Sequence, residues 1–105
     1  MVAAPLPSSP FGSGARTRAL LALSLMTETY PRELSRLLDA PLFSVQRALA
    51  SLEQDGMLAS RLIGRTRLYA LNPRYLASRE LREYLERLAG RDFELKRKIG
   101  VLRAR

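Results

Sequence analysis

The sequence predicts a mainly helical domain that carries one small β-hairpin, in the order helix, helix, helix, hairpin, helix. Leucines recur at helical spacing before residue 56 and after residue 80. Between these regions, two strand-length segments are joined by a short connection that contains a glycine. The length of 105 residues is that of one domain. We therefore expect a three-helix core followed by the hairpin and a C-terminal helix.

The first predicted helix covers residues 13–25, and Ser13 can cap its N-terminus. Its leucines spread over more than one face of the helix: Leu20, Leu21, Leu23 and Leu25. A helix that is apolar over so wide an arc is usually buried on two sides. We expect one side to face the core and the other to face a second subunit. Residues 26–30 form a linker that could lie extended.

Two short helices follow with a tight break between them. Pro31 suits the first turn of a helix, and Pro41 ends that helix because it biases Ala40 away from helical angles. The next helix begins near residues 42–44 and runs to residue 55, with Gly56 as its left-handed cap. Its buried stripe is Val45, Ala48, Leu49 and Leu52. By pattern alone, this arrangement is a helix-turn-helix.

The hairpin is predicted from residues 57–63 and 67–71, joined through Gly64-Arg65-Thr66. After it, Asn72 is a plausible cap for a turn. The last segment has a helical stripe of Leu81, Tyr84, Leu85 and Leu88. Gly90 can break this helix, and Asp92 can cap a continuation that carries Leu95, Ile99 and Leu102 on one face.

These elements suggest a division of the chain into three parts. Residues 1–10 are rich in proline, serine and alanine and are expected to form a disordered arm, residues 11–75 the main domain, and residues 76–105 an amphipathic helix with a basic tail. The apolar stripe of that last part has no other obvious place to pack. Together with the wide apolar arc of the first helix, this predicts a homodimer.

Charge and composition favour a polyanionic partner. The formal net charge is +8, from 18 basic and 10 acidic residues, and lysine occurs only at Lys96 and Lys98. Arginine forks suit phosphate and guanine, although genomic base composition can also favour arginine codons. A positive protein raises the local concentration of a polyanion around it.

The residue types that are missing exclude several kinds of chemistry. The sequence holds no cysteine and no histidine, which removes disulfides, thiolate nucleophiles, imidazole acid–base catalysis and the usual zinc ligands. We therefore expect no metal and no cofactor. No apolar run approaches the roughly 20 residues that cross a bilayer, and the N-terminus lacks the pattern of a signal peptide. A cytoplasmic protein without a membrane role is expected.

The pattern resembles the winged helix-turn-helix regulators of the ArsR and MarR type. Residues 33–38 look like their second helix, residues 45–58 like their recognition helix with its Leu-Glu-x-x-Gly-hydrophobic exit, and residues 64–69 like their wing. Phe11-Gly12-Ser13 followed by arginines resembles the entry to their first helix. The resemblance covers residues 11–88. It implies the winged helix-turn-helix fold and a regulator that binds double-stranded DNA.

The resemblance also implies a recognition helix in the major groove and a wing on the backbone or in the minor groove. The inward stripe leaves part of the recognition helix facing out, where Gln46 can pair with adenine and Arg47 with guanine or a phosphate. Arg32 is a further candidate for a phosphate contact. The complete set of predicted DNA contacts is Arg32, Ser44, Gln46, Arg47, Ser51, Arg61, Arg65, Thr66 and Arg67. Three wing arginines with no acid nearby favour a polyanion.

One segment departs from the family pattern. Ala40-Pro41-Leu42-Phe43 replaces the usual turn rich in serine and threonine. Phe43 is either a core residue or an exposed contact for a thymine methyl group. Metal sensing in the ArsR type relies on cysteine or histidine ligands, so metal-gated repression is not expected here.

Other interpretations compete with DNA binding. The outward residues of the helix could be ordinary solvated positions, and the arginine-rich hairpin tip could guard a sheet edge. The main alternative is a winged-helix interaction or scaffolding module. RNA binding and a surface-active basic tail are further options.

Phe11-Gly12-Ser13-Gly14 resembles the entry motif of small nucleotidyltransferases, but no acidic pair follows it, and Glu53 and Asp55 need not converge. We therefore do not expect an enzyme.

Overall fold

The computed structural model describes residues 11–12 and 14–103, and in this part of the chain five helices and two strands follow the predicted order. The predicted arm over residues 1–10 and the predicted cap at Ser13 lie outside the described residues. The elements are α1 (Gly14–Leu25), α2 (Pro31–Leu38), α3 (Leu42–Gln54), β1 (Leu58–Ile63), β2 (Thr66–Leu71), α4 (Ser78–Ala89) and α5 (Phe93–Arg103). The mainly helical class with a small hairpin is confirmed.

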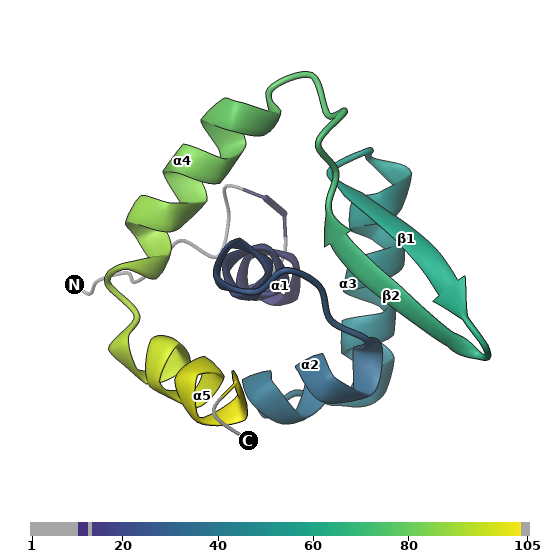
Figure 1. The fold of residues 1–105 in the computed structure, drawn as a ribbon, viewed down its shortest axis with the longest axis horizontal. Coiled ribbons are helices and arrows are strands. Elements are labelled where there is room, and N and C mark those ends of the chain that lie inside the picture. Colours follow the sequence, from purple (N-terminus) through teal and green to yellow (C-terminus); the bar gives the residue numbers. More distant parts are fainter. Residues whose placement is uncertain (1–10, 13, 104–105) are drawn as a thin grey trace.

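Helix α1 lies at the centre of the fold. Figure 1 looks almost along its axis, with the other elements arranged around it. It contacts α2, α3, β2, α4 and α5, and Thr17 and residues 19–23 are buried. The same chain therefore covers the wide apolar arc of α1, which corrects the expectation that a second subunit covers one side of it.

The turn between α2 and α3 depends on one left-handed residue. Asp39 ends α2 with φ 52°, and its N–H donates to the carbonyl of Arg36 at 3.3 Å. The next N–H, of Ala40, returns to the carbonyl of Ser35 at 3.1 Å, and the Ser35 hydroxyl donates to the Ala40 carbonyl at 2.6 Å. These bonds satisfy the last carbonyls of α2 and reverse the chain before Pro41. The segment Asp39-Ala40-Pro41 marked the end of this helix in the sequence, but the left-handed conformation of Asp39 was not predicted.

The turn at the end of α3 directs the backbone into the hairpin. Gly56 has φ +85°, the left-handed cap expected from the sequence. The Asn72 side chain donates to the Gly56 carbonyl at 3.0 Å, and the Met57 carbonyl accepts the Asn72 N–H at 2.9 Å. Asn72 also caps the following turn, because its side-chain oxygen accepts the N–H of Arg74 at 3.0 Å. The two ends of the hairpin are therefore tied to the end of α3.

The antiparallel hairpin, which we call the wing, has a tighter turn than expected. Ile63 pairs with Thr66, so only Gly64 and Arg65 form the turn and Thr66 belongs to β2. Gly64 has φ +63°, which fits a type II′ turn because that turn takes glycine at its first central position. On the other side of β2, Thr29 exchanges backbone hydrogen bonds with Tyr69 at 3.0 and 2.8 Å. The linker after α1 is thus extended at Thr29 and Tyr30, whereas Met26 and Thr27 form a bend.

The C-terminal segment consists of two helices. Gly90 ends α4, and the Asp92 carboxylate caps α5 by accepting the N–H of Leu95 at 3.0 Å. Both helices contact α1, and α5 also contacts α2. Their buried residues are Leu85, Ala89, Leu95 and Ile99. Apart from Tyr84, which is exposed, the apolar stripe of this segment packs inside the same chain, whereas the sequence suggested a partner subunit for it.

Candidate nucleic-acid interface

The outward side of α3 forms a ridge that faces away from the core. The predicted stripe of Val45, Ala48, Leu49 and Leu52 is buried, as expected. At 100° per residue, the positions opposite this stripe are Phe43, Arg47, Ala50 and Gln54, and all four are exposed. Gln46 lies on one flank of this ridge, while Ser44 and Ser51 lie on the other.

A groove separates the Gln46 flank of α3 from the wing. Its lining comes from α3, the wing and the start of α2, and its volume is about 470 Å³. It brings together five of the predicted contact residues: Arg32, Gln46, Arg65, Thr66 and Arg67. Because these residues are distant in sequence, their meeting in one open groove is the main structural support for the predicted site.

Two of the wing arginines are paired within the protein. Arg61 donates to both carboxylate oxygens of Glu28, at 3.0 and 3.1 Å. Arg67 donates to the Ser60 hydroxyl at 2.8 Å, and that hydroxyl donates to the Glu53 carboxylate at 2.6 Å. The expectation that no acid lies near the wing arginines is therefore wrong. The sequence could not show it, because Glu28 and Glu53 come from other elements.

Of the three wing arginines, the one at the tip of the wing, Arg65, has no partner within the described residues. Arg65 and Thr66 are exposed, and within the described part of the chain neither side chain forms a hydrogen bond or an ion pair. The five N–H donors of Arg65 are thus open to an external acceptor. Arg67 differs from Arg65, because its guanidinium donates to Ser60 and the Ser60 hydroxyl donates to Glu53 of α3. These two hydrogen bonds link the Arg67 side chain to α3.

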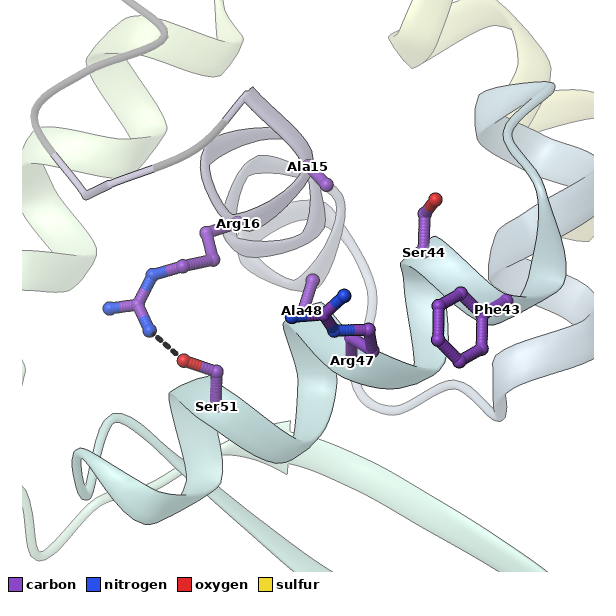
Figure 2. Close-up of a pocket in the computed structure, with 7 residues that line it drawn as sticks. All are labelled: Ala15, Arg16, Phe43, Ser44, Arg47, Ala48 and Ser51. Carbon is purple, nitrogen blue, oxygen red and sulfur yellow. Dashed lines mark hydrogen bonds between the residues drawn. The ribbon is translucent and has the colours of Figure 1, made fainter.

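Ser51 is not open on the outward face, which corrects another expectation. It is half-buried, and its hydroxyl accepts a hydrogen bond from Arg16 of α1 (Figure 2). The same guanidinium donates to the Asp55 carboxylate at 2.7 Å and to the carbonyl of Phe11. Any contact between Ser51 and DNA would have to compete with this network.

Beyond Ser51, a shallow hollow of about 380 Å³ lies between α3 and the start of α1. Figure 2 shows Ser44, Arg47 and Phe43 along the α3 side of this hollow and Ala15 and Arg16 on the α1 side. Ser44 and Arg47 are exposed, as predicted. They face a different space from the groove that Gln46 shares with the wing, so α3 divides the predicted contacts into two groups.

Three residues of this surface were absent from the predicted set. Phe43 is 67% exposed, which decides against the core position that the sequence left open. Gln54 shares the outward ridge with it, and the 11-residue spacing from Phe43 was a signal available in the sequence. Tyr69 lines the groove although it is mostly buried. Strand alternation alone did not mark it, because its neighbours Leu68 and Ala70 are apolar too.

The phenol of Tyr69 is a neutral donor in this groove. Burial raises the pKa of Tyr69, the nearby Glu53 carboxylate raises it further, and Arg67 opposes the change. Since a tyrosine already ionises only near pH 10, this shift keeps the hydroxyl protonated at neutral pH. The groove therefore offers guanidinium, amide and hydroxyl donors to an acceptor-rich partner.

The acidic residues around the end of α3 serve contacts within the protein. No group of three or more histidine, cysteine, aspartate or glutamate residues in this part of the chain is placed to hold a metal ion. Glu53 and Asp55 engage different elements, through Ser60 and Arg16, so the two carboxylates serve separate contacts. Among the described helices, none is both long and apolar enough to span a bilayer.

Comparison with known proteins shows likeness at the level of structure. No protein-family model and no curated protein sequence matched the chain. A transcriptional regulator of the MarR family from Silicibacter pomeroyi aligns with a TM-score of 0.60 and 22% identity, over 86% of this chain and 56% of that one. A variant of Lactococcus lactis ZitR aligns with a TM-score of 0.61 and 12% identity, over 90% and 66%.

A third structure, the adhesin competence repressor AdcR from Streptococcus pyogenes, gives a TM-score of 0.59 and 15% identity over 80% of this chain and 63% of that one. The chain thus spans between 56% and 66% of the length of these three proteins. At such identities the likeness concerns the fold. The fold of this chain is the winged helix-turn-helix found in regulators of the MarR type.

Proposed function

We propose that the protein binds double-stranded DNA and regulates transcription, with α3 in the major groove and the wing on the backbone or in the minor groove. The groove that joins Gln46 of α3 to Arg65, Thr66 and Arg67 of the wing is the observation that carries this proposal. Arg32, at the start of α2, adds a cation on the same side. In winged helices, a recognition helix and a wing on one side of the molecule suit simultaneous contact with bases and backbone.

Electrostatics supports the same partner. The net charge of +8 attracts a polyanion, and Arg65 remains unpaired within the described residues. Arg67, although bonded to Ser60, lines the same groove. The structural neighbours described as a transcriptional regulator and as a repressor add support for a binding protein rather than an enzyme. A cytoplasmic location, as expected from the sequence, remains part of the proposal.

The homodimer is a separate part of the proposal. The two observations that predicted it are explained within one chain, but large apolar side chains remain exposed in and around α4 and α5, with Tyr84 45% exposed among them. Leu76 is 99%, Phe93 77% and Val101 59% exposed. A two-fold pair formed through this region would place two α3 helices on one DNA site and favour a pseudo-palindrome. The same exposed residues would serve a protein partner if the interaction-module alternative holds.

The test is fluorescence anisotropy on a random DNA duplex, titrated over a range of salt concentrations. Wild type should bind with a steep negative salt slope, because each neutralised phosphate releases counterions. The Arg65→Ala/Arg67→Ala variant should lose about two units of that slope. A matched control, Arg87→Ala/Arg91→Ala, removes the same charge from exposed positions at the end of α4 and should keep the slope.

If both double variants lost the same number of units of salt slope, the wing would have no special role in DNA binding and only the net charge would matter. No binding of wild type even at low salt would overturn the DNA proposal and favour the protein-interaction module.

A further inference from the structure

Phe43 and Arg47 form a coupled pair on the outward ridge of α3. They are one helical turn apart, and the guanidinium carbon of Arg47 lies 5.5 Å from the centroid of the Phe43 ring. Figure 2 shows both side chains leaving the same side of α3. Within the described residues Arg47 forms no hydrogen bond or ion pair, so all its N–H donors remain open while the aromatic ring restricts where the guanidinium lies.

This pair combines a large apolar group and a directed cation on the outward ridge of α3. Phe43 is 67% exposed, and it is absent from the buried core. Ala50, the next residue along the ridge, is small and exposed, so the helix surface beyond Arg47 does not obstruct a close approach. The ridge therefore presents its two recognition groups at the N-terminal half of α3, the half that usually contacts base edges in helix-turn-helix proteins.

The chemistry of the pair matches one dinucleotide step. In the major groove, an arginine fork pairs with O6 and N7 of guanine, and a phenylalanine ring can contact the C5-methyl group of a pyrimidine. Four residues of helix rise about 6 Å, and stacked bases are about 3.4 Å apart, so neighbouring bases are within reach of the two side chains. We propose that Phe43 and Arg47 together read a guanine and an adjacent 5-methylpyrimidine, which is either thymine or 5-methylcytosine.

This inference rests on the proposed DNA binding, and its test separates the two. A preferred duplex is first selected from a random library with wild-type protein. Affinities are then measured for versions of its pyrimidine–guanine step that carry thymine, uracil, 5-methylcytosine or cytosine. Removal of the methyl group should weaken binding about fourfold in both pairs, the loss expected for one methyl group that leaves apolar contact. Replacement of the guanine by 7-deazaguanine should weaken binding at least fivefold.

Variants assign these preferences to the two residues. In Phe43→Ala, the ratio of thymine to uracil affinities should fall to about one, whereas Phe43→Leu should keep part of it because leucine still offers apolar surface. In Arg47→Ala, sensitivity to 7-deazaguanine should disappear. The matched control is Arg91→Ala, which removes an exposed guanidinium between α4 and α5 and should leave both ratios unchanged. Thermal unfolding of each variant should stay near that of wild type, because these side chains lie on the surface.

A methyl preference with both pyrimidines that vanishes in Phe43→Ala supports the inference. A selected duplex without such a step, equal affinity for thymine and uracil, or a methyl preference that persists in Phe43→Ala overturns it while leaving DNA binding intact. A protein that binds no duplex overturns this inference and the proposed function together.

Discussion

Arg16 connects three separate parts of the molecule through one guanidinium group. It reaches the Phe11 carbonyl before α1, the Ser51 hydroxyl within α3 and the Asp55 carboxylate just after α3. Its side chain is only 16% exposed, so solvent does not replace these partners freely. The orientation of α3 against α1 depends in part on this residue, although it lies outside the groove shared with the wing.

Arg16→Ala should lower the free energy of unfolding by about 1 to 3 kcal/mol, because charge-assisted hydrogen bonds are lost and the Ser51 and Asp55 acceptors lose their donor. Urea denaturation followed by circular dichroism measures this change. Arg91→Ala, at an exposed position between α4 and α5, serves as the control and should change stability by less than about 0.5 kcal/mol. Equal stability of the two variants would show that the Arg16 network does not stabilise the fold.

At the scale of elements, two glycines illustrate opposite backbone requirements. Gly56 joins α3 to the wing with φ +85°, and a Cβ added there would meet only Tyr75, at 3.9 Å. The space is sufficient, so any cost of a side chain at this position comes from the backbone angle. Gly100 lies inside α5 without positive φ, and a Cβ added there meets nothing within 4 Å.

Gly56→Ala should therefore destabilise the protein by about 1 to 2 kcal/mol, since a left-handed conformation is unfavourable for an L-residue with a Cβ. Gly100→Ala should instead stabilise it by about 0.5 to 1 kcal/mol, because alanine is the better helix former. Both values come from the same denaturation experiment. A loss of stability in Gly100→Ala would contradict the helical environment of α5.

Sequence reasoning succeeded for elements defined by local patterns. The stripe of α3, the proline at the start of α2, the caps at Gly56 and Asp92 and the Gly64 turn all have local signals, and the structure contains each of them. It failed where the answer depends on distant residues. The wide apolar arc of α1 shows that two sides are buried but cannot say which element buries them, and the partners of Arg61, Arg67 and Ser51 come from elsewhere in the chain.

At the scale of the whole molecule, the apolar surface that remains exposed decides how copies could meet. The apolar stripe of α5 is buried in the core through Leu95 and Ile99. Phe93 and Val101 are therefore the large apolar side chains of α5 that remain exposed for contact with a partner. Both residues are more than half exposed, and neither belongs to the buried core. This separates a loss of association from a loss of folding.

Analytical ultracentrifugation at micromolar concentration should therefore show a dimer for wild type. Phe93→Ser/Val101→Ser should shift the mass to that of a monomer while thermal unfolding of the fold stays cooperative, because burial of apolar surface drives such association. A wild-type monomer under these conditions would contradict the homodimer and leave α3 to act singly on DNA.

The central position of α1 also has a consequence during synthesis of the chain. Residues 14–25 are made before the elements that pack against them, and two of those elements, α4 and α5, are formed only by residues 78–103. Until those residues emerge, the leucine-rich surface of α1 has only part of its native cover. The nascent chain therefore carries incompletely covered leucines until α4 and α5 have been made, which favours aggregation during that interval.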